Sequence, residues 1–315
     1  MNNKYTGQEI CVLVPTKDRP EHVARLLKSL VDQVEQVKYI IIVASGKDIK
    51  TTIDNFSDDL LIKYYHTSQS GQIRQRNIGI SKLDDHTPLV ACIDDDIILD
   101  PFAIKEMVKF WNNASENTGG VGFNEKSGTK YQATIIQQLL FLGHRKPGRV
   151  LRSGTSTLIS NLEESIRSQW LNGGMTVWRK DMLVNYKHKE INTKWAIGED
   201  LIFSYPIGKV FPLYVCASAT VSHNHYPYDT EDNKWHFSYG RTQTIWLYYF
   251  VNSNKELLKV LFFFTLFIRV FSKYSYGLIA RRWDLVNFSL GAISAVVEIA
   301  KFEFGLSVKD DIRED

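Results

Sequence analysis

The stretch Leu89-Val90-Ala91-Cys92-Ile93-Asp94-Asp95-Asp96 joins a run of five apolar residues directly to three carboxylates. A continuous apolar run of this length is typical of a strand that is buried on both faces, as the strands of parallel sheets are. Ligands of such sheets bind beyond the carboxyl ends of the strands, so we expect the three aspartates at a binding edge. Neighbouring carboxylates repel one another, which favours a bound cation, and all-oxygen ligands select Mg²⁺ or Mn²⁺.

The alternative for this acidic run is a solvated turn before the next helix. Asp100-Pro101 already provides a cap for that helix, so the three carboxylates have no structural task and a functional one is favoured. Asp94 and Asp96 are two residues apart, and their side chains point the same way if the chain is extended. We expect one of them to hold the metal and the other to contact the ligand, with Asp95 on the opposite side.

Apolar runs alternate with helical patterns on either side of this strand. Further strands are expected at residues 10–14, 39–43, 61–65, 173–178 and 211–221. Helices are expected from Pro20, over residues 73–83 and after Asp100-Pro101. Residues 125–160 read as loops and short strands. Strands separated by helices predict an α/β fold with a mainly parallel sheet that is covered by helices on both faces.

The bulk composition excludes several classes of protein. A hydrophobic share of 44% and a charged share of 23% are those of a globular protein with a large core, and not of a disordered chain. A net charge of +3 gives no reason to expect a nucleic-acid partner. Cys11, Cys92 and Cys216 stand in apolar runs without a CxxC pair, which indicates buried thiols in a reducing compartment. The polar start Met1-Asn2-Asn3-Lys4 shows no signal peptide, and a cytoplasmic protein is expected.

The chain changes in texture after residue 245. Residues 257–271 and 285–299 are strongly apolar, but each run is shorter than the ~20 residues that span a bilayer. The basic residues around them, Lys255, Lys273, Arg281 and Arg282, suit helices that lie on an anionic membrane surface. The alternatives are a helical hairpin packed on the preceding domain and an interface of a homo-oligomer. We therefore divide the chain into a domain at 1–245, a helical, membrane-associating segment at 246–305 and a polar tail at 306–315.

Several motifs, taken in order, resemble the inverting family-2 glycosyltransferases, which have the GT-A fold. Val12-Leu13-Val14-Pro15-Thr16 resembles the family's first strand and nucleotide-contacting turn, and Gly71-Gln72-Ile73-Arg74-Gln75-Arg76-Asn77-Ile78-Gly79 resembles its G-x-x-x-x-R-N-x-G segment. Asp94-Asp95-Asp96 matches its D-x-D motif, Gly173-Gly174 the small residues of its acceptor-side strand, and Gly198-Glu199-Asp200 its E-D motif. The order and spacing agree over roughly residues 8–245, and several motifs in order are far more specific than a lone D-x-D.

The resemblance implies transfer of a sugar from a nucleotide-diphosphate donor to a hydroxyl of a glycan or lipid-linked acceptor, as in cell-surface polysaccharide synthesis. Asp200 resembles the family's general base, and Glu199 is expected to bind the acceptor or share that role. Asp96 and His223 are the expected ligands of Mn²⁺ or Mg²⁺, with His225 as the alternative to His223. The residues expected to bind the nucleotide sugar are Pro15, Thr16, Arg19, Ser45, Gln72, Arg76, Asn77, Asp94, Asp95, Gly173, Gly174 and Arg241.

For two of these groups the residues also fit a purely structural role. Arg74 and Arg76 suit a diphosphate through their guanidinium forks, but an exposed helix face would also carry them. Glu199 and Asp200 would equally be acids at a helix start. The chain departs from the family after its second strand, where Ala44-Ser45-Gly46-Lys47-Asp48 lacks the acids that hold the nucleoside. Asp18 or Asp48 is expected to substitute.

Other functions fit the sequence less well. A sugar nucleotidyltransferase usually carries a glycine-rich loop after its first strand, and Pro15-Thr16-Lys17-Asp18-Arg19-Pro20 has no glycine. A glycosidase with two carboxylates would not need Arg74, Arg76 or three adjacent acids. A non-enzymatic, membrane-associated glycan-binding protein would explain the C-terminal segment but would leave the acidic motifs unexplained.

Overall fold

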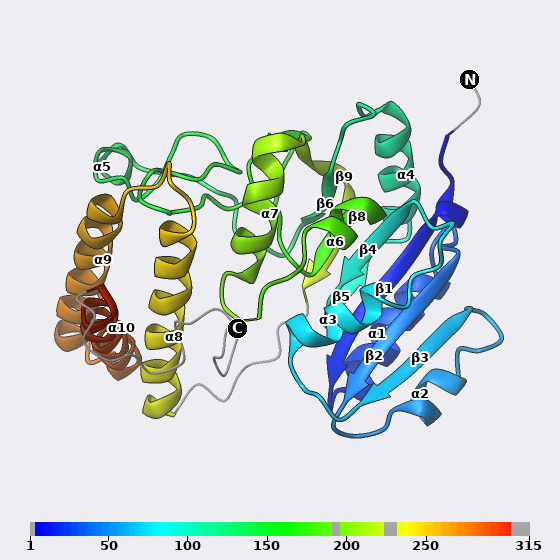
Figure 1. Cartoon of the computed structure of the whole chain (residues 1–315), viewed down its shortest axis with the longest axis horizontal. Helices are drawn as coiled ribbons and strands as arrows, with labels where there is room; N and C mark the ends of the chain where they lie inside the picture. The colour runs from blue at the N-terminus through cyan, green and yellow to red at the C-terminus, as the bar shows by residue number, and fades with distance from the viewer. Residues whose placement is uncertain (1–3, 191–195, 224–231, 304–315) are drawn as a thin grey trace. The chain divides into compact units, whose positions relative to one another are not determined.

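The computed structural model describes residues 4–190, 196–223 and 232–303 (Figure 1). The chain groups into two compact units. The first comprises Met1–Tyr131, Leu158–Lys189 and Asp200–His225, and the second comprises Gln132–Thr157, Glu190–Glu199 and Tyr226–Asp315. Residues 132–157 therefore belong with the C-terminal helices, which no local sequence signal indicated. The proposed division at residues 245 and 305 stays a prediction, because compactness does not show where an independently folding domain ends.

The described part of the first unit is built on a nine-stranded sheet with the order β3-β2-β1-β4-β8-β6-β9-β5, and β7 pairs with β9. The strands are β1 (Ile10–Lys17), β2 (Tyr39–Ser45), β3 (Ile62–Thr67), β4 (Leu89–Ile93), β5 (Ile97–Leu99), β6 (Gly120–Glu125), β7 (Ile166–Ser168), β8 (Met175–Arg179) and β9 (Leu213–His223). The strands β3, β2, β1 and β4 are parallel neighbours, as Figure 1 shows. From β8 onward the sheet is mixed, since β8 runs antiparallel to both β4 and β6. The α/β class is confirmed.

Helices connect and cover these strands. In the first unit they are η1 (Gly7–Glu9), α1 (Pro20–Val31), α2 (Lys50–Asp54), α3 (Gln72–Ile80), α4 (Ala103–Asn113) and α6 (Lys180–Asn185). The second unit contains α5 (Ile135–Leu139), α8 (Asn233–Asn252), α9 (Lys259–Ile279) and α10 (Trp283–Glu303). The helix α7 (Glu199–Val210) begins at the last residue of the second unit and continues in the first.

The core of the first unit follows from the apolar pattern. In β1 every residue except the last is buried, because the strand has parallel neighbours on both sides and helices over its faces. Proline at the first position of α1 starts that helix without loss of a hydrogen bond, and Val23, Leu26, Leu27 and Leu30 then form its buried face. Cys11, Cys92 and Cys216 are buried free thiols, as the sequence predicted.

The prediction that Asp100 caps the following helix with its side chain is wrong. α4 begins at Ala103, and its N-cap residue Phe102 makes no side-chain hydrogen bond to the helix. Leu99 pairs with Val221, which places the Asp100 carboxylate beside Thr220, whose hydroxyl donates to it. Asp100 thus joins β5 to β9. Its side chain does not cap α4, so it gives no reason to exclude a structural role for the three aspartates.

The described helices of the second unit pack closely. α8, α9 and α10 run beside one another (Figure 1). A Cβ atom on Gly240 would collide with the Phe288 carbonyl, and one on Gly291 would collide with the Phe237 carbonyl, so α8 and α10 approach backbone to backbone. By length and composition α10 is apolar enough to cross a membrane, although the buried helix of a soluble unit passes the same test.

Candidate active site

Asp94, Asp95 and Asp96 lie in a tight turn at the carboxyl end of β4. β4 ends at Ile93, and the Asp94 carbonyl accepts a hydrogen bond from the Ile97 amide at 3.2 Å. The expectation that Asp94 and Asp96 point the same way assumed an extended chain and is wrong. In this turn Asp94 faces α3, whereas Asp95 and Asp96 both lie beside Arg19 and Asp96 also contacts His223.

Asp94 is held by the helix that precedes its strand. Its Oδ1 accepts hydrogen bonds from Arg76 Nη2 at 2.7 Å and from Gln72 Nε2 at 2.9 Å, both from α3. Arg76 is buried, with 1% of its side chain exposed, whereas 26% of the Asp94 side chain is exposed. A buried guanidinium that faces a half-buried carboxylate fixes the position of the carboxylate.

Gly174 gives Asp94 its space on the other side. The Gly174 carbonyl accepts the Asp94 amide at 2.9 Å, because Met175 in β8 pairs with Ile93 in β4. A Cβ atom on Gly174 would collide with the Asp94 carboxylate, so only glycine leaves this carboxylate in place. Gly173 and Gly174 lie in a turn, so the strand predicted at 173–178 begins only at Met175.

Asp95 turns toward the interior and joins β4 to the end of β1. Its carboxylate accepts the Thr16 hydroxyl at 2.6 Å and Arg19 Nη1 at 3.2 Å. Burial raises the pKa of Asp95 to about 6, although the Thr16 hydrogen bond and the Arg19 charge oppose that rise. With 5% of the residue exposed, Asp95 fastens the turn rather than facing a ligand.

Asp96 faces β9 and meets His223. Asp96 Oδ1 lies 3.1 Å from His223 Nε2, and Glu125 Oε1 lies 3.9 Å from His223 Nδ1. Burial alone would raise the pKa of Asp96, but the hydrogen bond and charge of His223, with Arg19, lower it. Burial would lower the pKa of His223, and the bond to Asp96 raises it instead. The two side chains form one coupled acid–base pair.

This pair fits a divalent cation as a partial ligand set. Mn²⁺ accepts both a carboxylate oxygen and an imidazole nitrogen as ligands. Glu125 lies beside the other imidazole nitrogen, where a carboxylate orients a ligating histidine. Among the described residues no cluster of three or more His, Cys, Asp or Glu side chains is arranged to hold a metal. Mg²⁺-type sites in phosphate-transferring enzymes commonly have one or two protein ligands, with substrate phosphates and water completing the shell.

Three further predicted residues lie at the ends of the parallel strands. Pro15 and Thr16 are the two residues before Lys17, the last residue of β1. Ser45 ends β2 fully buried, and its hydroxyl makes no hydrogen bond to any described residue. Asn77 points elsewhere, since its Nδ2 donates to the His188 carbonyl at 3.0 Å. Arg74 is exposed, in contrast to buried Arg76.

Asp18 and Asp48, the expected substitutes for the missing acids, have separate local tasks. Asp18 has a positive φ of 56°, and its Oδ1 accepts the Lys47 amide at 2.7 Å, which closes the loop after β2 onto the loop after β1. Asp48 accepts the Tyr64 hydroxyl at 2.7 Å and the Lys50 amide at 2.9 Å. These contacts place both acids beside the carboxyl ends of β1, β2 and β3.

Glu199 and Asp200 are the first two residues of α7, directly after Gly198 with its φ of +94°. Asp200 Oδ1 accepts the Leu201 amide at 2.8 Å, and its carbonyl accepts the Ser204 hydroxyl at 2.5 Å. The alternative interpretation as acids at a helix start therefore describes their local structure correctly. It is compatible with a chemical role, because the positive end of a helix dipole favours a negatively charged carboxylate.

The described geometry does not test two of the predicted residues. Arg241 lies on α8 in the second unit, where its guanidinium makes a two-pronged contact with Glu298, with distances of 3.1 and 2.6 Å. Its assignment to the nucleotide sugar stays a prediction. His225, the alternative to His223, lies outside the described residues.

Two residues of the site were not predicted from the sequence. Glu125 ends β6 and reaches His223 only because β6 and β9 pair in parallel, a pairing between segments far apart in the chain. Gln75 is buried on α3, and its Nε2 donates to the Thr16 carbonyl at 2.6 Å and the Val43 carbonyl at 2.8 Å. Its place inside the motif that contains Gln72 and Arg76 was the available signal.

Comparisons with known proteins agree with this geometry. The family model described as "Glycosyl transferase family 2" matches residues 11–162. The mannosyltransferase PcManGT from Pyrobaculum calidifontis, solved in complex with GDP-Man and Mn²⁺, has a TM-score of 0.54 at 12% identity, over 96% of this chain and 80% of that one. Residues 1–349 of TarS from S. aureus give a TM-score of 0.51 at 12% identity, over 94% and 91% of the two chains.

At such low identity these structures show a shared fold, and no curated protein matches the chain by sequence. An acidic turn follows β4 in this fold, and its Asp94 is bound by Arg76 of α3. The matched segment contains both of these elements. Residues 11–162 therefore match the family-2 glycosyltransferases, and the chain has the GT-A fold.

Proposed function

We propose that this glycosyltransferase uses a nucleotide-diphosphate sugar and a divalent cation. We further propose that it inverts the anomeric configuration and elongates a glycan or lipid-linked acceptor of a cell-surface polysaccharide. The observation that carries the proposal is the division of labour in the acidic turn. Asp94 is fixed by Arg76 at 2.7 Å, and Asp96 is paired with His223 at 3.1 Å. Asp94 would thus bind the sugar, and Asp96 would hold the cation that counters the charge of the diphosphate.

Asp94 is suited to hold a hydroxyl of the donor sugar. Both protein donors, Arg76 and Gln72, bind its Oδ1, which leaves the acceptor capacity of Oδ2 for a ligand. The carboxylate is held from two sides, by α3 and by the turn before β8, so little orientational freedom is lost when a sugar binds.

Asp96 and His223 are the residues that would hold Mn²⁺ or Mg²⁺. The bound ion would neutralise charge that develops on the departing diphosphate. The solved complex of PcManGT with GDP-Man and Mn²⁺ supports the choice of ion and of donor class. Glu125, near His223 Nδ1, would keep the imidazole oriented with Nε2 toward the ligand side.

Asp200 is proposed as the general base. It takes the proton of the acceptor hydroxyl while that oxygen forms a bond to the anomeric carbon. The bond from this carbon to the diphosphate oxygen breaks, and its electron pair leaves with the nucleotide. Attack from the face opposite the leaving group inverts the anomeric configuration. Glu199, the neighbouring acid, would bind the acceptor.

Replacing the base tests this proposal. The donor is identified first by a thermal-shift screen of nucleotide sugars with Mn²⁺, because a ligand that binds only the folded state raises Tm. Asp200→Asn should then lower transfer by about 10²- to 10⁴-fold, the usual contribution of a general base, with donor affinity nearly unchanged. Glu199→Gln is the matched control and should mainly raise the KM of the acceptor. Full transfer by Asp200→Asn would remove Asp200 as the base.

We also propose that the protein is cytoplasmic and lies on the inner face of the cell membrane through its C-terminal helices. Val260, Phe264, Phe267 and Phe271 recur along one side of α9 and are exposed, with Phe267 at 67%. Such an apolar stripe suits a bilayer interface. Replacing Phe267 and Phe271 with serine should lower binding to lipid vesicles; unchanged binding would favour a homo-oligomer interface on this face.

A further inference from the structure

Residues 132–157 form an apolar and basic insertion whose short helix is well formed. α5 begins with a capping box, in which the Thr134 hydroxyl accepts the Gln137 amide and the Gln137 side chain accepts the Thr134 amide. The helix nevertheless exposes Ile135 at 76%, Ile136 at 69% and Leu139 at 72%. A capped turn that holds three large aliphatic side chains in water is an unusual surface for a soluble unit.

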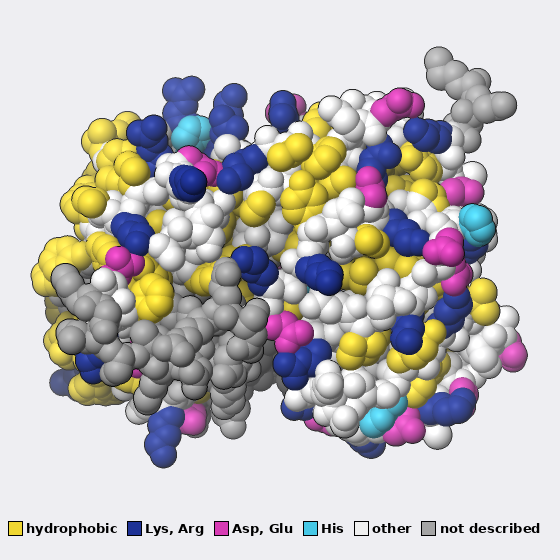
Figure 2. Space-filling view, viewed as in Figure 1, with side chains coloured by type: hydrophobic (Ala, Val, Ile, Leu, Met, Phe, Trp, Pro, Cys, Tyr) yellow, Lys and Arg dark blue, Asp and Glu magenta, His cyan; other side chains and the backbone are white. Residues whose placement is uncertain are grey.

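The same insertion carries only positive charge. Arg145, Lys146, Arg149 and Arg152 are all exposed, and residues 132–157 contain no Asp or Glu. None of the four forms an ion pair with a residue that the structure describes. Figure 2 shows Lys and Arg side chains gathered over the part of the second unit where Figure 1 draws α5 and its loops. The four cations are therefore available to an anionic partner.

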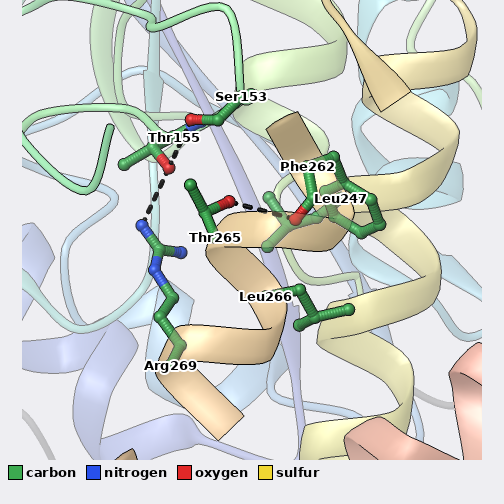
Figure 3. A pocket seen from close by; sticks show the side chains of 8 residues that line it. Ser153, Thr155, Leu247, Phe262, Thr265, Leu266 and Arg269 are labelled. Carbon is green, nitrogen blue, oxygen red and sulfur yellow. Dashed lines mark hydrogen bonds between the residues drawn. The ribbon is translucent and has the colours of Figure 1, made fainter. Parts of the chain in front are cut away.

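A polar chain fastens this insertion to α9. Arg269 Nη2 donates to the Thr155 hydroxyl at 2.9 Å, and Ser153 Oγ lies 3.0 Å from Thr155 Oγ1 and donates to the Phe141 carbonyl at 3.0 Å (Figure 3). At the start of α9 the Leu258 amide donates to the Arg152 carbonyl at 2.8 Å. The insertion thus has a defined place on the helix that carries the exposed phenylalanine stripe.

We propose that residues 135–152 are a second membrane-contacting element, whose occupant is the surface of an anionic bilayer. The side chains of Ile135, Ile136 and Leu139 enter the interface, while the four cations bind lipid phosphates. A two-fold symmetric dimer formed through this segment would place its positive charges against those of the second copy, and charge repulsion opposes that contact. This inference deepens the proposed membrane contact and rests on it, but it does not depend on the catalytic assignments.

Vesicle binding of the full chain tests the charges. We would compare sedimentation with phosphatidylcholine vesicles and with vesicles containing 30% phosphatidylglycerol. Each comparison would be made at 0.1 M NaCl, where the screening length is about 10 Å, and at 0.5 M NaCl, where it is below 10 Å. The fourfold change Arg145→Gln, Lys146→Gln, Arg149→Gln and Arg152→Gln should weaken binding to the anionic vesicles by up to about 10³-fold. The reason is that each Lys or Arg near such a surface contributes about fivefold.

A matched control removes four exposed lysines from helices of the first unit. Lys28→Gln, Lys50→Gln, Lys105→Gln and Lys109→Gln change the net charge equally and should change vesicle binding less than about threefold. Donor-induced thermal shift, measured without vesicles, should be retained in both variants and confirms their folding.

A fluorescent reporter tests insertion without removing any charge. Leu139→Cys labelled with an environment-sensitive dye should shift to the blue on anionic vesicles, whereas the same label at exposed Leu61 in the first unit should not. The three native cysteines are buried and should leave this chemistry undisturbed.

The outcomes separate the proposals. If the wild-type chain binds neither kind of vesicle, the proposed membrane contact and this inference both fail, while the donor-binding results stand. Equal binding by the wild type and the fourfold arginine and lysine variant overturns this inference and leaves the C-terminal helices as the contact. A Leu139 reporter that responds to protein concentration and not to vesicles also overturns it, in favour of a second copy as the occupant.

Discussion

The guanidinium of Arg76 donates to the Asp94 carboxylate at 2.7 Å from a position where almost none of the arginine side chain reaches solvent. Replacing this buried and paired guanidinium with a cation that water solvates would cost free energy. The interaction therefore links the packing of α3 directly to the position of Asp94, the residue proposed to bind the donor.

Arg76→Lys keeps the charge but loses the planar fork that holds Asp94. We expect kcat/KM to fall by about 10²-fold, the effect of misplacing a reacting group by about 1 Å. Steady-state kinetics with the identified donor measures this. Arg167→Lys, at an exposed position of β7, is the matched control and should behave as the wild type. Wild-type kinetics in Arg76→Lys would show that Asp94 needs only a nearby charge.

Gly174→Ala should displace Asp94, because the added methyl group collides with its carboxylate. We expect donor affinity to fall by at least about tenfold, and the loss should appear in the donor-dependent rise of Tm. Gly122→Ala, in β6 of the same sheet, is the control. Its added methyl would meet the end of the flexible Leu171 side chain at 3.3 Å and should leave donor affinity in place. Equal donor affinity in Gly174→Ala and the wild type would mean that Asp94 does not bind the donor.

His223→Ala and Asp96→Asn should each weaken Mn²⁺ binding by more than about 10²-fold, measured as free Mn²⁺ by electron paramagnetic resonance. Glu125→Gln should weaken it less, within the 10- to 100-fold range of a group that orients a ligand. The order follows from the 3.1 and 3.9 Å contacts that place Asp96 and Glu125 on opposite nitrogens of the imidazole. Unchanged Mn²⁺ affinity in His223→Ala would remove that histidine as a ligand and leave His225 to be tested.

His188 should make the fold sensitive to acid. Its ring stacks on Phe203 with centroids 3.8 Å apart, and burial, with the Arg76 charge, lowers its pKa from 6.5 to about 3. Between these values the unfolded chain binds more protons at this residue than the folded one, so stability falls as pH falls. From pH 6.5 to 5 this residue alone should cost about 2 kcal/mol.

Urea unfolding of the wild type and of His188→Phe at these two pH values measures that contribution. Phenylalanine keeps a flat ring against Phe203 and cannot be protonated, so the variant should lose less stability on acidification by about this amount. Equal losses in the two proteins would mean that His188 is protonated in the folded state.

The parallel half of the sheet could be predicted because its signal is local. β1, β2 and β4 are continuous apolar runs, and α1 shows its buried face at helical spacing. The acidic turn follows such a strand, so its place at the sheet edge was also foreseeable.

The remaining half depends on pairings between distant segments. β6 contains two glycines and ends in two polar residues, so it lacks a continuous apolar run, and its partner β9 begins about ninety residues later. The helix cap predicted for Asp100 is wrong for the same reason. The local rule takes no account of Thr220, 120 residues away, whose hydroxyl donates to the Asp100 carboxylate. Glu125 reaches His223 only through this long-range register.

The hydrogen bond from Arg269 to Thr155 joins residues 114 positions apart. At a synthesis rate of ~5–20 residues per second, about 6 to 23 s separate the appearance of the two partners. During that interval the growing chain presents the aliphatic and basic insertion before the helix that anchors it exists. Under the membrane contact proposed for residues 135–152, a nascent chain would reach a lipid surface while it is still attached to the ribosome, before its fold is complete.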